Sequence, residues 1–220
     1  MEYVEDPLKS LAGIFEYDRP FLAGDIEDFH AELALITLDS RIDVDVRQLF
    51  ETAKNVALYS RFVYRFHQVA ESVGFSALEL ALKTLHAKST SEKPPMGLSQ
   101  LLRWAFRCGL LNEDYFGDQL EDFTRAGIRE ERERAAAKLR DSGQTPEGTN
   151  RPITEEDMQD GFTRNLGVYH YIGVVSGLRN GLSHGSTMLM PSSISSLRRA
   201  AELINYLNRD VKSPPSTGQQ

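Results

Sequence analysis

Apolar residues recur every three or four positions along most of this chain, as at Phe75, Leu78, Leu82 and Leu85. This spacing puts them on one face of a helix that turns once every 3.6 residues. No segment of useful length alternates apolar and polar residues as a half-buried strand does. The sequence therefore predicts an all-α fold, a bundle of long antiparallel helices.

The same periodicity and the residues that start or stop helices set the expected boundaries. Helices are expected over residues 25–38, 43–73, 75–87, 98–110, 114–140, 162–182 and 194–210. The helix over 43–73 would run for about 45 Å at 1.5 Å per residue. Gly74 is a natural stop, so a tight connection there should join two long antiparallel helices.

The chain is long enough for one domain with its own core, which we place at residues 25–210. Residues 1–24, with Pro7, Pro20 and several glycines, predict an extended N-terminal arm. Residues 141–153 are polar and rich in glycine and proline, which indicates a mobile loop, and residues 211–220 predict a disordered tail. The highly charged helix over 125–140 should be solvent-exposed on at least one face.

Composition excludes several classes of protein. No apolar run approaches the ~20 residues that cross a bilayer, and the N-terminus lacks the layout of a signal peptide, so a cytoplasmic protein is expected. Cys108 is the only cysteine, which rules out an internal disulfide and a cysteine-based metal site. The net charge of −7 argues against a general nucleic-acid coat but leaves room for a local basic pocket with few phosphate contacts.

The usual catalytic signatures are missing: there is no P-loop, no strand-linked dinucleotide fingerprint, no zinc-protease motif and no nucleophile elbow. No metal and no cofactor are therefore expected. Four of the five histidines, His30, His67, His86 and His170, are most simply read as buried structural or surface side chains.

The fifth histidine, His184, stands in a polar cluster with Arg179, Asn180 and Ser183, where an apolar helix gives way to a serine-rich loop. One interpretation is a helix C-terminus, ended by Gly181 or a following glycine, whose cationic side chains complement the negative end of the helix dipole. The other is a functional site.

The run from Arg179 to His184, an arginine, four residues and a histidine, resembles the Arg-x4-6-His motif of HEPN domains. Asn180 corresponds to the polar residue that these domains favour directly after the arginine. HEPN domains also resemble this chain in placing long antiparallel helices first and the motif near the last helices, so the resemblance covers roughly residues 25–210. Only the six-residue motif is specific.

The resemblance implies a homodimer in which two copies of the motif form one composite cleft and cleave RNA without a metal. Histidine suits general acid or base catalysis near neutral pH, and arginine suits a bidentate grip on phosphate. His184 would be the acid or base, Arg179 would stabilise the phosphate, Asn180 would orient either group, and Ser183 is a candidate phosphate contact. A toxin or defence role, with an antitoxin or defence partner, is implied by analogy.

Two features qualify this reading. Toxins of this family that pair with a nucleotidyltransferase antitoxin carry a tyrosine two residues after the histidine, where this chain has Ser186. On a straight helix Arg179 and His184 also lie about 140° apart around the axis, so they share a cleft only if Gly181 loosens the helix or the cleft wraps its end. The alternative is a non-catalytic module in which the motif cements a dimer or binds a nucleotide or a partner protein.

Overall fold

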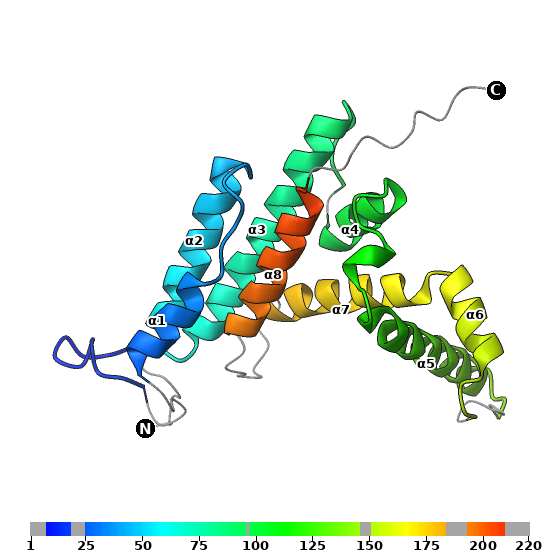
Figure 1. Cartoon of the computed structure of the whole chain (residues 1–220). Coiled ribbons are helices and arrows are strands. Elements are labelled where there is room, and N and C mark those ends of the chain that lie inside the picture. Colours follow the sequence, from blue (N-terminus) through cyan, green and yellow to red (C-terminus); the bar gives the residue numbers. More distant parts are fainter. Residues whose placement is uncertain (1–7, 19–24, 96, 146–150, 184–192, 210–220) are drawn as a thin grey trace. The chain divides into compact units, whose positions relative to one another are not determined.

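The all-α prediction is confirmed. A computed structural model describes residues 8–18, 25–95, 97–145, 151–183 and 193–209, without the side chain of Ser183. Across these residues the chain forms eight α-helices and one short 3-10 helix, and none of them forms a strand (Figure 1). Contacts group the described chain into two units, one from residues 1–95 and 179–220 and one from residues 96–178. The single domain expected over 25–210 stays a prediction.

The first unit holds four helices that pack side by side (Figure 1). They are α1 (Ile26–Ala34), α2 (Val44–Tyr59), α3 (Phe66–Ser89) and α8 (Ser193–Leu207). Asp25 and Asp43 cap the first two helices by accepting hydrogen bonds from the amides of Glu27 and Asp45. The core is built from fully buried apolar side chains of three helices, with Phe50 from α2, Leu82 from α3 and Ile204 from α8 among them.

The expected helix boundary at Gly74 is wrong. Helix α3 runs through Gly74, and the break lies earlier, between Tyr59 and Phe66, so that no single helix covers 43–73. A Cβ atom at Gly74 would stand 2.5 Å from Cδ2 of Leu197, a fully buried side chain of α8. This glycine therefore lets two helices approach closely and does not stop either of them.

The early break between α2 and α3 is held by the N-terminal arm. The carboxylate of Asp18 accepts a hydrogen bond from the amide of Tyr64 at 2.8 Å, and the Asp18 amide donates to the Arg61 carbonyl at 3.0 Å. The Tyr17 ring also packs on Phe62, with centroids 5.1 Å apart. Described residues 8–18 form turns and no helix, and the extended arm expected over residues 1–24 stays a prediction.

The second unit holds α4 (Leu98–Arg107), η1 (Glu113–Tyr115), α5 (Gln119–Asp141), α6 (Glu155–Thr163) and most of α7 (Leu166–Ser183). Its interior combines edge-to-face contacts among Tyr115, Phe116, Phe123 and Tyr171 with close approaches at glycines. A Cβ at Gly127 of α5 would stand 2.6 Å from the Leu166 carbonyl oxygen. The backbones of α5 and α7 therefore meet directly.

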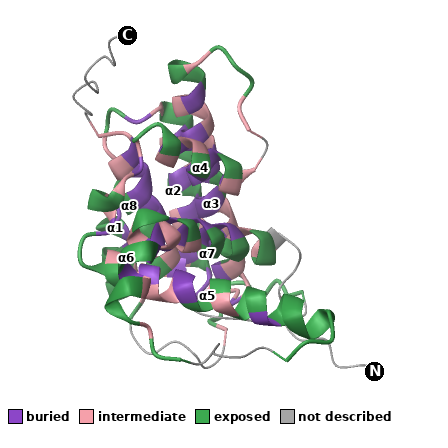
Figure 2. Cartoon of the chain, turned by 90° about the vertical axis from the view of Figure 1, so that its right-hand side faces the viewer, coloured by how far each residue is buried: buried purple, intermediate pink, exposed green. Residues whose placement is uncertain are grey.

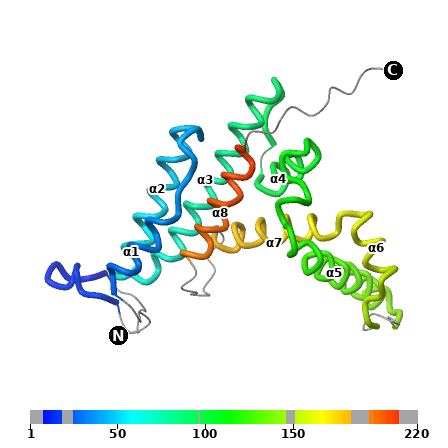
Figure 3. The backbone as a smooth tube through the Cα atoms, viewed as in Figure 1, coloured from blue at the N-terminus to red at the C-terminus, as the bar shows by residue number. Residues whose placement is uncertain are grey.

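Helix α6 was not anticipated, because the sequence predicted a helix beginning only near residue 162. It starts with a capping box: Thr154 accepts a hydrogen bond from the Asp157 amide, and the Asp157 carboxylate accepts from the Thr154 amide at 2.8 Å. Asn165, at φ 55°, then separates α6 from α7, and the backbone turns sharply between the two helices (Figure 3).

Buried residues are frequent along α3 and α8, whereas exposed residues predominate on α5 and α6 (Figure 2). The core of the expected mobile loop, residues 146–150, and the expected tail, 211–220, lie outside the described residues. None of the described helices is both long enough and apolar enough to cross a bilayer.

Candidate functional site at the end of helix α7

Helix α7 carries the start of the predicted motif in its last turns. Arg179 is half-buried and Asn180 is exposed. The helix continues without interruption through Gly181 to Ser183, so the described backbone is not loosened at this glycine. His184 and the side chain of Ser183 lie outside the described residues.

Arg179 is held by an ion pair with a residue far away in the sequence. Its Nη2 atom lies 3.3 Å from Oε2 of Glu79 on α3, and the other oxygen of that carboxylate lies 2.6 Å from Nζ of Lys83. The Glu79 side chain is only 12% exposed, against 37% for Arg179. A nearly buried carboxylate needs such partners, because burying an unpaired charge is costly. Glu79 therefore fixes the direction of Arg179.

The two described motif residues lie on different faces of α7. Arg179 follows the buried residues Ile172 and Val175 by seven and four positions, which puts it on the buried face. Asn180 follows Gly173 by seven positions, which puts it on the exposed face, about 100° around the helix from Arg179. The structure thus does not bring Arg179 and Asn180 together within one chain. A cleft that uses both side chains would have to wrap around the end of the helix.

The exposed face of α7 is unusually open. Gly173, Gly177 and Gly181 follow one another at intervals of four, and no described atom outside α7 lies within 4 Å of a Cβ placed at any of them. Val174 and Leu178 beside them are 40% and 49% exposed. We call Gly173, Val174, Gly177 and Leu178 the open face of α7.

Two other histidines are accounted for by structural contacts. His67 is buried, with Nδ1 2.6 Å from the Ser193 hydroxyl, and burial together with the nearby Arg61 charge lowers its pKa to about 4. Nδ1 of His170 lies 2.8 Å from the Glu130 carboxylate, whose pKa this hydrogen bond lowers. These contacts agree with the structural interpretation of both histidines.

Two features of the molecule were not predicted from the sequence. Glu79 could not be found, because only the folded chain brings it to Arg179, 100 positions away. The second feature is a pocket lined by five arginines along α5 and the segment before α6. Their spacing along the charged helix was a usable signal, since residues three or four apart share one face.

Within the described ranges, no three histidine, cysteine, aspartate or glutamate side chains are grouped closely enough to hold a metal ion. No family model, curated protein or solved structure matches this chain.

Proposed function

We propose that this chain is a metal-independent endoribonuclease of the HEPN type, active as a homodimer whose composite cleft joins the ends of two α7 helices. The observation that carries the proposal is the open face of α7. In the sequence, Asn180 follows Gly177 of this face by three positions and His184 follows it by seven. The acid or base would be His184, and Arg179 would stabilise charge on the phosphate.

The open face supports a close contact between two copies of the chain. A glycine inside a helix costs about 0.5–1 kcal/mol relative to alanine, so the two glycines of the open face need a compensating role. Gly74 and Gly127 have that role within the chain, because each admits a neighbouring helix. At Gly173 and Gly177 a second copy would supply the neighbour. The exposed Val174 and Leu178 side chains would be buried in the same contact.

The chemistry follows from the residue types. One His184 accepts the proton of the ribose 2′-hydroxyl while its oxygen forms a bond to phosphorus. The bond from phosphorus to the 5′-oxygen breaks, and the partner subunit's His184 donates a proton to that oxygen. Arg179 stabilises the negative charge on the non-bridging oxygens in between. The products are a 2′,3′-cyclic phosphate and a 5′-hydroxyl.

The test is RNA cleavage by the purified full chain in excess chelator. Cleavage should persist with chelator and fall by at least about a hundredfold in His184→Ala, the usual scale for loss of a general acid or base. His30→Ala, which removes an exposed histidine from α1, should leave the rate unchanged. Equal cleavage by His184→Ala and the wild type would overturn the proposal.

The dimer is tested by light scattering on Gly177→Leu. A leucine fits the open space of a single chain but keeps a second α7 away, so this variant should be monomeric and inactive. Ala137→Leu adds the same side chain to an exposed site on α5 and should stay dimeric. A dimeric, active Gly177→Leu would show that α7 does not form the interface.

A second candidate function is a non-catalytic assembly module, and the ion pair between Arg179 and Glu79 favours it. An arginine committed to a nearly buried carboxylate serves the stability of the fold. In that case Glu79→Gln and Arg179→Ala should both lower the melting temperature, and the wild type should never cleave RNA. If the chain is instead a nuclease, Glu79→Gln should fold and retain cleavage, because Arg179 keeps its charge.

A further inference from the structure

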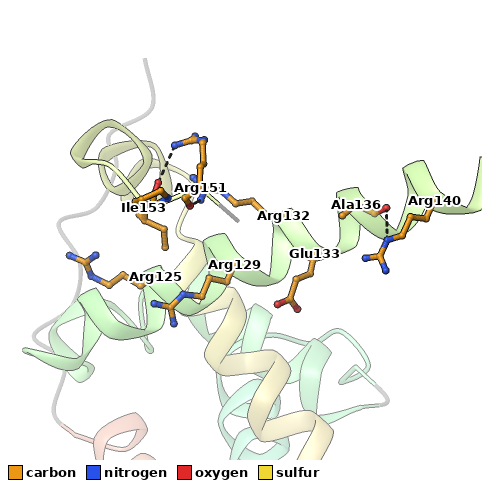
Figure 4. A pocket seen from close by; sticks show the side chains of 9 residues that line it. Arg125, Arg129, Arg132, Glu133, Ala136, Arg140, Arg151 and Ile153 are labelled. Atoms are coloured by element: carbon orange, nitrogen blue, oxygen red, sulfur yellow. Dashed lines mark hydrogen bonds between the residues drawn. The ribbon is translucent and has the colours of Figure 1, made fainter. Parts of the chain in front are cut away.

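The second unit contains a pocket of about 540 Å³ that the proposed mechanism does not use. Five of the nine described residues that line it are arginines, and one is a glutamate. Four arginines come from α5, and Arg151 comes from the segment that leads into α6 (Figure 4). On a chain with a net charge of −7, these arginines concentrate positive charge in one place, and positive charge attracts anions.

The row of arginines follows from the helical repeat of α5. Arg125, Arg129, Arg132 and Arg140, together with the buried Ala136, are spaced by three, four or eight positions and therefore share one face. The row extends for about 22 Å along the helix axis, at 1.5 Å per residue. A pocket of this shape suits an extended anion better than a single phosphate.

Three of the five arginines already have carboxylate partners. Arg125 pairs with Glu121 at 2.6 Å, and the Asp157 carboxylate lies 2.8 Å from Arg132 and 2.5 Å from Arg151. The hydrogen bonds from Arg151 and Thr154 hold the pKa of Asp157 well below its usual range, so this carboxylate stays charged. Because the single Asp157 carboxylate lies between two guanidinium groups, one net positive charge remains. The carboxylate also fixes the directions of Arg132 and Arg151.

The other two arginines have no acidic partner among the residues that the structure describes. Arg129 and Arg140 are both exposed, and the one hydrogen bond given for Arg140 goes to the Ala136 carbonyl, at 3.3 Å. Guanidinium groups in this condition bind phosphate oxygens well, because their planar fork donates two parallel hydrogen bonds. They line the pocket at two points along α5 (Figure 4).

We propose that this arginine pocket binds the phosphate backbone of a single RNA strand, with Arg129 and Arg140 making the principal phosphate contacts. Naming RNA as the ligand rests on the proposed function. None of the described lining residues is aromatic and could stack on a base, so the pocket takes the backbone without regard to base sequence. The small number of uncommitted arginines gives a shallow dependence of affinity on salt.

The experiment measures fluorescence anisotropy of the full-length protein with a labelled 2′-O-methyl RNA of about 12 nucleotides. This probe has the RNA backbone but cannot be cleaved, because its 2′-oxygen is blocked. Arg129→Gln/Arg140→Gln is compared with Arg134→Gln/Lys138→Gln, which removes two positive charges from the same helix outside the pocket. All four side chains are exposed, so both double variants should fold.

The pocket variant should bind the probe at least about tenfold more weakly, and its plot of log affinity against log salt should lose about 0.7 in slope for each phosphate contact removed. The control should bind within about threefold of the wild type, because charge outside the pocket acts only through screened long-range attraction. Equal weakening in both variants, or no binding by the wild type, would overturn the proposal. Tighter binding of inorganic polyphosphate than of the probe would overturn RNA as the ligand.

The outcome is separable from that of the nuclease test. Probe binding that depends on Arg129 and Arg140, with no cleavage of ordinary RNA, would support the proposal for the pocket and overturn the proposal of a nuclease. Cleavage that depends on His184 while the pocket variant binds and cleaves normally would do the reverse.

Discussion

The two units of this molecule differ in how the helices inside each unit pack against one another. In the first unit, α2, α3 and α8 meet mainly through large buried side chains, with one close approach at Gly74. Some polar groups between these helices are paired, as Nδ1 of His67 is with Ser193 and Glu71 is with Ser196. In the second unit, α5 meets its neighbours at glycines, where backbone lies against backbone or side chain, and its charged groups pair on the surface.

This difference shows where each unit is vulnerable. The first unit is sensitive to the protonation state of the buried His67, because a buried polar group tolerates charge poorly. The second unit depends on the absence of side-chain atoms at a few positions, because close-packed interiors do not accept extra volume. Each of the following predictions tests one side of this comparison.

The largest expected effect is a loss of stability of the first unit in acid. His67 has a pKa of about 4 in the folded chain, below its ordinary value of 6.5. Between these two values the unfolded chain binds the proton and the folded chain does not. Neutral His67 therefore contributes its full share to the free energy of unfolding above pH 6.5. This share is lost as the pH falls towards 4, by about 3 kcal/mol in all. Hydrogen exchange of α3 peptides at several pH values measures it.

His67→Gln should remove this part of the pH dependence, although it also lowers stability at neutral pH. His30→Gln, at an exposed position, should leave the pH profile unchanged. An identical profile in His67→Gln and the wild type would show that His67 is not the group responsible.

The next largest effect is expected at Gly127 in the second unit. A methyl group there would stand 2.6 Å from the Leu166 carbonyl oxygen and 2.9 Å from its carbonyl carbon, so that α5 and α7 have to separate. Gly127→Ala should lower the free energy of unfolding by about 2–3 kcal/mol, measured by urea denaturation. Unchanged stability would mean that the two helices are not in backbone contact.

The matched change at Gly177 should act in the opposite direction. Because no described atom outside α7 lies near a Cβ at this position, Gly177→Ala should stabilise the dilute, monomeric chain by up to about 1 kcal/mol through its higher helix propensity. Thermal melts at low protein concentration measure this. Destabilisation comparable to that of Gly127→Ala would remove the distinction between the two kinds of glycine.

The smallest effect is expected for the surface ion pairs of the second unit. Arg164 pairs with both Glu131 and Asp160, and all three side chains are largely exposed to solvent. Solvent screening leaves such pairs worth roughly 0–1 kcal/mol, so Arg164→Gln should shift the urea midpoint only slightly. The difference between variant and wild type should shrink further in 1 M salt. A loss as large as that from Gly127→Ala would show that surface charge, and not close packing, holds this unit.

Much of the fold was accessible from the sequence, because helical periodicity and capping residues act over a few positions. Helices α1 and α8 begin within one residue of where they were expected. The break between α2 and α3 was not accessible. There the Asp18 carboxylate accepts a hydrogen bond from the Tyr64 amide, 46 positions away, and no local pattern records such a contact.

The candidate site divides in the same way. The sequence alone determined that the fold is helical and that Arg179 and Asn180 point to different sides of α7, because successive residues of any helix are rotated by about 100°. Only the tertiary structure decided that Glu79 engages Arg179, that Gly74 and Gly127 admit neighbouring helices while Gly177 does not, and that five arginines line one pocket. The reason is physical: helix formation is governed by near neighbours, whereas ion pairs and close approaches require partners that only folding brings together.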